Sequence, residues 1–297
     1  MKTPKRIEPL IEDGLVDEVL RPLMSGKEAA VYVVRCGTEL RCAKVYKEAN
    51  KRSFRQAAEY QEGRKVRNSR QARAMAKGSK YGRKEAEDAW QNAEVAALFR
   101  LASAGVRVPK PYDFLDGVLL MELVTDAHGD AAPRLNDVYL EPDQALEYHA
   151  FVIRQIVLML CAGLVHGDLS EFNVLLGPDG PVIIDLPQAV DAAGNNHAFS
   201  MLERDVGNMR AYFGRFAPEL QDTRYAREMW SLYQAGELLP ETSLTGQFKD
   251  DDHEADVGGV LREIDAARLD DERRRAARAD AERGSVKGEE PPPPWMQ

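Results

Sequence analysis

The sequence predicts an α+β fold of two lobes, a small β-rich N-lobe followed by a larger helical C-lobe. Three observations predict it. Runs of β-forming residues fill positions 15–47, helical periodicity dominates after position 124, and two brief apolar runs interrupt the helical half near positions 173–185. The chain has 297 residues, 44% of them hydrophobic, which is enough for two domains with a sizeable buried core.

The N-lobe is expected to span residues 15–124, after an N-terminal extension (1–14) in which no element is predicted. Three β-forming runs within 15–47 are separated by short turns and predict three antiparallel strands. Two further strands within 109–124 meet at the dipeptide Asp116-Gly117, a typical hairpin turn.

Between these strand groups, residues 84–104 have helical periodicity. Trp90, Glu94, Leu98 and Leu101 recur at spacings of four, four and three, and Gly105 supplies a stop. One side of this helix is therefore expected to face the core, with Glu94 as its only acidic member.

The C-lobe is expected to span residues 125–248. Helical patterns cover 141–164, 199–216 and 220–236, and the runs NVLL (173–176) and PVIID (181–185) read as a strand pair. From residue 249 the chain is nearly all charge and ends in prolines, which predicts a disordered tail over 249–297.

Composition excludes several classes. The three cysteines have no metal-ligand spacing, the N-terminus lacks a signal-peptide pattern, and no apolar run is long enough to span a bilayer. These features predict a soluble cytoplasmic protein with reduced thiols and no membrane partner.

Charge is distributed unevenly. The net charge is −9, yet residues 41–84 hold fifteen Lys and Arg against three acids. Residues 48–83 are also poor in large apolar groups, which predicts a mobile basic insert. A solvated charged segment is the simpler interpretation, and a surface for nucleotide or RNA phosphates is the alternative.

The strongest functional signal is VHGDLSEFN (165–173), a polar loop between an apolar helix and an apolar strand. Phosphoryl transfer needs a carboxylate beside the attacking hydroxyl and an oxygen ligand for the metal that bridges the phosphates. Asp168 and Asn173, five residues apart, suit those tasks and match the spacing of a protein-kinase catalytic loop. Asp185 ends the next apolar run, where kinases hold magnesium, although Leu186-Pro187-Gln188 follows in place of Phe-Gly.

Two further features agree with this chemistry. Strand alternation points Lys44 inward, where an unpaired ammonium is costly, and Glu94 is the carboxylate that could pair with it. The turn MSGKEAAV (24–31) could present Ser25, Gly26 and Lys27 to phosphates, although it retains only one glycine of a kinase glycine loop.

SGKEAAVY, the Lys44 strand, HGDLSEFN and IIDLPQ, in this order with a basic insert before the Glu94 helix, resemble the RIO family of atypical serine/threonine protein kinases. The resemblance covers about residues 15–235 and implies a two-lobed protein-kinase-like fold. It implies an ATP- and Mg²⁺-dependent kinase (with Mn²⁺ as an alternative) that autophosphorylates and acts on a protein substrate that the sequence does not identify. The short N-terminal extension indicates a member without the winged helix that some relatives carry.

By position, the resemblance assigns roles to individual residues. Asp168 becomes the catalytic base, Asn173 and Asp185 the metal ligands, and Asp185 also a phosphate acceptor in an ATPase switch. The predicted nucleotide contacts are Ser25, Gly26, Lys27, Glu28, Lys44, Glu94 and, at the adenine hinge, Met121 and Leu123. Family ties to ribosome assembly suggest RNA or a ribosomal particle as a partner of the basic insert.

Two alternatives stay open at this point. A small-molecule kinase of the aminoglycoside or choline type shares H-G-D-L, although SGKEA and DLPQ are not its pattern. A nucleotide-switched ribosome-assembly factor with little kinase turnover would keep the same site residues.

Overall fold

The structure, a computed structural model, describes residues 3–26, 28–47 and 80–249. The chain as far as Phe248 forms one compact unit. Lys27, most of the predicted basic insert and the predicted tail lie outside the described residues. The predicted division into domains at residues 14, 124 and 248 stays a prediction.

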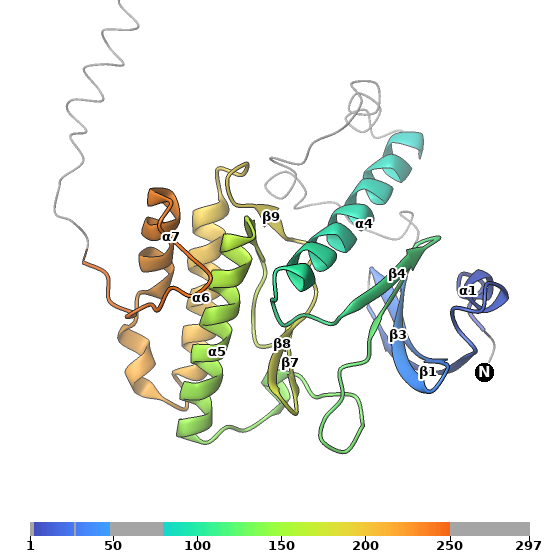
Figure 1. Cartoon of the computed structure of the whole chain (residues 1–297), viewed down its shortest axis with the longest axis horizontal. Helices are drawn as coiled ribbons and strands as arrows, with labels where there is room; N and C mark the ends of the chain where they lie inside the picture. The colour runs from blue at the N-terminus through green and yellow to red at the C-terminus, as the bar shows by residue number, and fades with distance from the viewer. Residues whose placement is uncertain (1–2, 27, 48–79, 250–297) are drawn as a thin grey trace, which may run out of the picture. The chain divides into compact units, whose positions relative to one another are not determined.

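Five antiparallel strands form the sheet of the N-lobe, in the order β1-β2-β3-β5-β4 (Figure 1). Pro22 lies in the edge strand β1, the one place where a missing backbone donor leaves the ladder intact, and the register of β1 shifts on both sides of it. All five predicted strands are therefore present: β1 (Glu18–Ser25), β2 (Ala29–Cys36), β3 (Glu39–Tyr46), β4 (Pro111–Leu115) and β5 (Val118–Glu122).

The predicted hairpin joins β4 to β5 through a two-residue loop. Leu115 pairs with Val118, and the two residues between them, Asp116 and Gly117, have φ values of 48° and 74°. Positive φ at both central positions is the conformation that matches the twist of a hairpin, and Asp-Gly adopts it readily.

Each face of the sheet is covered by a helix. Helix α1 (Glu8–Glu12) buries Ile7 and Leu10 against Val34, Ala43 and other residues of the outer face. No element was predicted in residues 1–14, so α1 adds a helix to the predicted fold. It was missed because five residues are too few for a periodic pattern.

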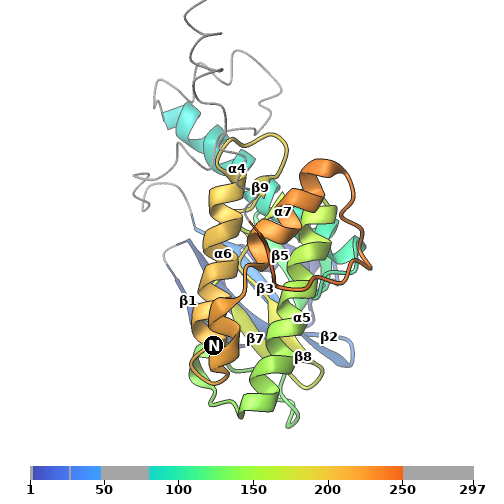
Figure 2. The ribbon, with the colours of Figure 1, turned by 90° about the vertical axis from the view of Figure 1, so that its left-hand side faces the viewer.

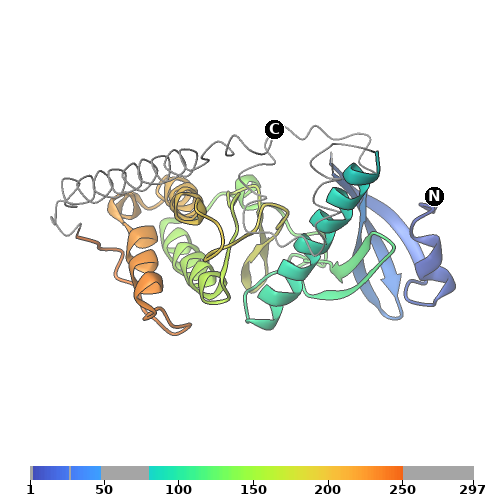
Figure 3. The ribbon, with the colours of Figure 1, turned by 90° about the horizontal axis from the view of Figure 1, so that it is seen from above.

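Helix α4 (Lys80–Ser103) lies between the sheet and the helical lobe (Figure 3). It begins four residues before the predicted start, so the last part of the predicted insert, from Lys80, is helical. Its Leu98 and Leu101 belong to one apolar core with Leu119 of the sheet and the interior of the C-lobe. This shared core holds Glu94 at the junction of the two lobes.

The C-lobe packs helices α5 (Pro142–Cys161), α6 (Ala198–Phe213) and α7 (Tyr225–Ala235) side by side, with the hairpin of β7 (Val174–Gly177) and β8 (Gly180–Ile183) next to them (Figure 2). These are the predicted elements, except that the predicted 220–236 helix is shorter, because the 3₁₀ turn η3 (Pro218–Asp222) precedes α7. The remaining elements were not predicted: η2 (Leu135–Asp137), β6 (Leu164–Val165) and β9 (Val190–Asp191).

Helix α5 runs through the core of this lobe. Its start carries a capping box, in which Glu141 and Gln144 each accept a hydrogen bond from the backbone N–H of the other, with Pro142 in the first turn. No helix in the described part of the chain is long and apolar enough to cross a membrane.

Candidate active site

A cavity of about 600 Å³ lies between the N-lobe sheet and the β7–β8 hairpin. Such a volume is typical of a small-molecule site. Of the residues predicted to bind nucleotide or metal, the following line it: Gly26, Glu28, Lys44, Glu94, Met121, Leu123, Asn173 and Asp185. Ser25 and Asp168 are exposed and lie outside the lining.

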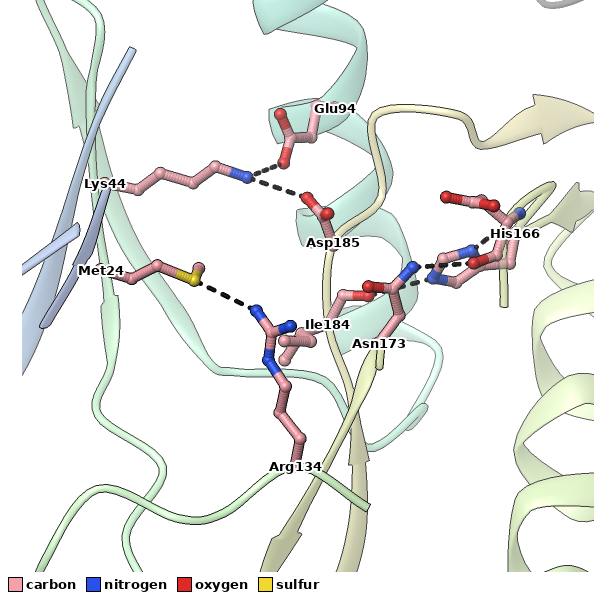
Figure 4. Close-up of polar contacts among 9 residues, drawn as sticks. Met24, Lys44, Glu94, Arg134, His166, Asn173, Ile184 and Asp185 are labelled. Carbon is pink, nitrogen blue, oxygen red and sulfur yellow. Dashed lines mark hydrogen bonds and ion pairs between the residues drawn. The ribbon is translucent and has the colours of Figure 1, made fainter. Parts of the chain in front are cut away.

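Lys44 is the centre of the cavity's polar network. Its Nζ lies 2.5 Å from Glu94 Oε1 and 3.4 Å from Asp185 Oδ1 (Figure 4). The predicted Lys44–Glu94 pairing is therefore present, and it includes Asp185 as a second anion. The contacts join a strand, a helix and the segment after β8, which are far apart in sequence.

Burial alone would lower the pKa of Lys44. The attraction of Glu94 and Asp185, together with their hydrogen bonds, outweighs that cost and raises the pKa above its usual range. Lys44 therefore stays a cation at any physiological pH. Glu94 is 5% exposed and its Oε2 has no hydrogen-bond partner among the described residues, so this carboxylate is held mainly by one ammonium.

Asp185 has a left-handed backbone, with φ of 67°. Outside tight turns this conformation is uncommon for a residue with a side chain and costs free energy. Here it follows the buried strand β8 and precedes the buried Leu186. The strain lies at a carboxylate that contacts Lys44 and lines the cavity, and functional sites are where such strain tends to occur.

His166 joins the loop around Asp168 to the Asp185 segment. Its Nε2 lies 3.1 Å from the carbonyl oxygen of Ile184, and its Nδ1 lies 3.3 Å from the backbone N of Asp168. Since a backbone N–H only donates, Nδ1 accepts and Nε2 carries the proton that goes to Ile184. The buried His166 ring therefore ties the two candidate catalytic segments together.

Side chains of helix α6 hold the loop around Asp168 through hydrogen bonds to its backbone. The Asp205 carboxylate accepts hydrogen bonds from the backbone N–H groups of Gly167 (2.7 Å) and Leu169 (2.9 Å), which flank Asp168. Arg204 donates to the Gly167 carbonyl oxygen, and Asn208 Nδ2 donates to that of Leu169 at 2.8 Å. One turn of helix thus positions the backbone on both sides of Asp168.

Burial raises the pKa of Asp205 from 3.8 to about 6, against the lowering effects of His166, its two backbone hydrogen bonds and Arg204. Asp205 was not among the predicted site residues. A carboxylate on the buried side of an amphipathic helix was the available signal.

The turn between β1 and β2 is braced by Lys47. Its Nζ donates to Ser25 Oγ (3.1 Å) and to the Gly26 carbonyl oxygen (2.5 Å), and Gly26 N donates to Ala29 O at 2.9 Å. Ser25 therefore faces a lysine at the turn instead of the cavity wall. Lys47 was not among the predicted site residues.

At the predicted hinge, the Glu122 carboxylate is bound by Arg107. Both Arg107 Nη atoms bind its carboxylate, at 2.9 Å and 2.7 Å, and Lys110 N donates to it at 2.9 Å. Met121, Glu122 and Leu123 all line the cavity. The charged side chain of the hinge is thus committed to Arg107 and the backbone of Lys110.

A divalent metal fits this site only together with phosphates. Among the described residues no group of three or more His, Cys, Asp or Glu could hold an ion alone. Asn173 Nδ2 donates to the Asp168 carbonyl oxygen at 2.8 Å, which leaves the amide oxygen of Asn173 for another ligand beside the Asp185 carboxylate. One carboxylate and one amide, completed by phosphate and water oxygens, is a common magnesium set.

Comparison with known proteins identifies the family. The RIO domain family matches residues 30–226, about two thirds of the chain. The chain belongs to the RIO family. Its members are kinases, which use a nucleotide and a divalent metal.

Several curated relatives are named as RIO1 serine/threonine-protein kinases. The RIO-type serine/threonine-protein kinase Rio1 of Haloferax volcanii is 39% identical over 212 residues, 70% of this chain and 68% of that protein. Rio1 of Methanocaldococcus jannaschii is 34% identical (64% and 61% covered), and human serine/threonine-protein kinase RIO1 is 30% identical (72% and 36% covered). The match thus spans about a third of the human relative.

A solved crystal structure of a kinase domain is also similar, at 14% identity and a TM-score of 0.41, covering 74% of this chain and 67% of that chain. The fold described above, a five-stranded lobe joined to a helical lobe around one cavity, agrees with the kinase-like prediction.

Proposed function

We propose that this RIO-family chain transfers the γ-phosphate of ATP to a serine or threonine hydroxyl, its own or that of a protein substrate. The observation that carries the proposal is the Lys44–Glu94–Asp185 network at one cavity, next to the loop that holds Asp168 and Asn173. Lys44 then binds the α- and β-phosphates, while the backbone of Met121 and Leu123 receives the adenine.

Mg²⁺ is the proposed metal, with Mn²⁺ as an alternative, and Asn173 and Asp185 would hold it. When bound, the ion neutralises charge on the phosphate oxygens. Gly26 and Glu28 line the cavity near the phosphate end, and Ser25 and Lys27 complete the turn in this proposal.

Asp168 is the proposed base. Its side chain is exposed beyond the cavity lining, where an acceptor hydroxyl from another molecule can approach. Asp168 takes the proton of that hydroxyl as its oxygen bonds to the γ-phosphorus. The bond between the γ-phosphorus and the bridging oxygen breaks, and ADP leaves with the electron pair.

A single-turnover experiment with γ-labelled ATP tests this function. Asp168→Ala should abolish label transfer while ATP affinity stays nearly unchanged, since the base acts on the hydroxyl and not on the nucleotide. Asp179→Ala, at an exposed aspartate of the β7–β8 turn, is the matched control and should keep full activity. Full transfer by Asp168→Ala would refute the assignment.

A second proposed activity is an ATPase switch through Asp185. An oxygen of its carboxylate would attack the γ-phosphorus, ADP would leave, and water would later hydrolyse the acyl-phosphate. What supports this proposal is the position of the Asp185 carboxylate, which lines the cavity beside Lys44, where the phosphates of ATP would lie. Hydroxylamine-labile label at Asp185 is the expected result, whereas label found only on serine or threonine would leave a simple kinase.

RNA or a ribosomal particle is the proposed partner of the basic insert, on charge alone. Binding should weaken steeply with added salt, as release of counterions requires. Salt-independent binding would contradict this proposal. A small-molecule kinase is disfavoured because every curated relative named above is a serine/threonine-protein kinase.

A further inference from the structure

One cation that lines the cavity has no anionic partner among the residues that the structure describes. Among the described residues that line the cavity, Lys44 and Arg134 are the cations. Lys44 is committed to two carboxylates. The polar contact of the Arg134 guanidinium within the described chain is to a thioether: its Nη2 lies 3.1 Å from Met24 Sδ.

A thioether sulfur is a poor match for a guanidinium. Arginine presents five N–H donors in a planar fork and binds carboxylates or phosphates best, whereas a methionine sulfur is a weak acceptor. Arg134 is also half-buried, so water meets its donors only in part. An anion that reaches this position should therefore bind the guanidinium more strongly than the Met24 sulfur does.

The backbone of Arg134 is held by contacts within the C-lobe. Arg134 forms a β-bridge with Leu175 of β7, and Pro133 O accepts a hydrogen bond from Leu176 N at 2.9 Å. The following 3₁₀ turn η2 buries Leu135 completely. The guanidinium therefore extends from a rigid support on the C-lobe.

The position of the guanidinium indicates which anion it meets. Figure 4 shows the Arg134 side chain extending from the C-lobe to Met24, with Asn173 and Asp185 on its other side. Met24 directly precedes the Ser25–Gly26 turn of the N-lobe. Arg134 thus lies between the proposed phosphate turn and the proposed metal ligands.

We infer that Arg134 binds the phosphate chain of the nucleotide, leaving Met24 for the phosphate oxygens when ATP enters. The inference rests on the proposed function and adds a phosphate-binding residue from the C-lobe. Lys44 binds the chain from the sheet, and Arg134 binds it from the opposite side. ATP then links the two lobes through two cations, and adenosine cannot.

Equilibrium binding of ATP, ADP and adenosine to the full chain tests the inference without relying on turnover. Arg134→Gln should weaken ATP binding about ten- to a hundredfold, the usual effect of losing a charged hydrogen bond. ADP should lose affinity in the same direction, and adenosine should bind as it does to the wild type. Arg134→Lys keeps the charge but lacks the planar guanidinium, so its ATP affinity should lie between those of the wild type and Arg134→Gln.

Arg35→Gln is the matched control, since Arg35 is an exposed arginine paired with Glu18 outside the cavity, and it should leave all three affinities unchanged. Unchanged ATP affinity in Arg134→Gln, with a wild type that binds ATP, would overturn this inference alone. Equal losses for adenosine and ATP would also overturn it, because they indicate a distorted pocket. A wild type that binds no ATP would instead overturn the proposed function itself.

Discussion

At the scale of single residues, the site combines paired charges with one strained backbone position. The pairing of Lys44 with Glu94 was predictable because each charge, placed on an apolar face, needs the other to offset the cost of burial. The left-handed conformation of Asp185 was not predictable. Nothing in the local sequence demands it, and the buried Leu186 and the contact with Lys44 impose it through tertiary packing.

Two substitutions of Asp185 should therefore differ in stability but cause the same loss of activity. Asp185→Ala keeps a Cβ in a left-handed conformation, whereas Asp185→Gly removes it. We expect the glycine variant to have a free energy of unfolding about 1 kcal/mol higher than the alanine variant. Both variants should lose Mg·ATP affinity and transfer together, because both lack the carboxylate.

Urea denaturation and ATP titration in the presence of Mg²⁺ measure the two effects separately. Gly→Ala replacement at Gly37, which has φ of 60° in the β2–β3 turn and no atom within 4 Å of an added Cβ, supplies a calibration of the same backbone cost. Equal stabilities of the Asp185 variants would mean that the strain is relieved elsewhere in the chain.

At the scale of elements, helix α6 controls the loop around Asp168. Its three polar side chains reach the backbone of a segment that lies 36 to 39 residues earlier. Sequence patterns identify such a helix and its apolar stripe, but they do not show which distant backbone a buried carboxylate serves. This is why the catalytic loop was predictable and its support was not.

The protonation of Asp205 should appear in the pH dependence of transfer. Its carboxylate accepts from two backbone N–H groups, and protonation replaces one acceptor oxygen by a donor. As pH falls through about 6, the loop loses one of these contacts and kcat should decline. Stability should change in the opposite direction. Because the pKa of Asp205 is raised in the folded state, the free energy of unfolding should decrease as pH rises from about 4 to about 6.

Asp205→Asn separates these effects. It should lower kcat by up to about a hundredfold through misplacement of Asp168, with ATP affinity unchanged. The decline near pH 6 should also disappear, which a merely destabilised protein would not show. An Asp205→Asn variant that retains the wild-type pH profile would exclude Asp205 as the titrating group.

At the scale of the whole molecule, the order of strands, helices and motifs was sufficient to predict two lobes around a phosphoryl-transfer site. Alternation in residues 15–47 and the stripe from Trp90 to Leu101 carry that information locally. Helix α1 and the two-residue strands β6 and β9 are too short to leave a pattern. Arg107 was also missed, since its contacts form only when the lobes are folded together.

Arg107 connects parts of both lobes at the hinge. It binds Glu122 of β5 through two Nη atoms, its backbone N donates to Gln155 Oε1 of α5 at 2.7 Å, and its carbonyl oxygen accepts from Ile183 N of β8 at 2.9 Å. Burial works against ionisation of Glu122, but the hydrogen bonds and charges of Arg107 and Lys110 outweigh it and lower the pKa of that carboxyl. The ion pair therefore stabilises the hinge.

A double-mutant cycle on this pair is the last prediction. Arg107→Met and Glu122→Gln should each lower the free energy of unfolding by about 1–3 kcal/mol, because each leaves a half-buried charge without its partner. The double variant should lose less than the sum, with a coupling of about 1 kcal/mol or more in urea denaturation. The lowered pKa of Glu122 also means that wild-type stability is lost as pH falls below about 4.5, through the folded-state value. That acid loss should shrink in Arg107→Met, whose Glu122 has no guanidinium to keep it ionised. Strictly additive single effects would show that the Arg107 and Glu122 side chains stabilise the fold independently of each other, and that the two lobes do not depend on this ion pair at the hinge.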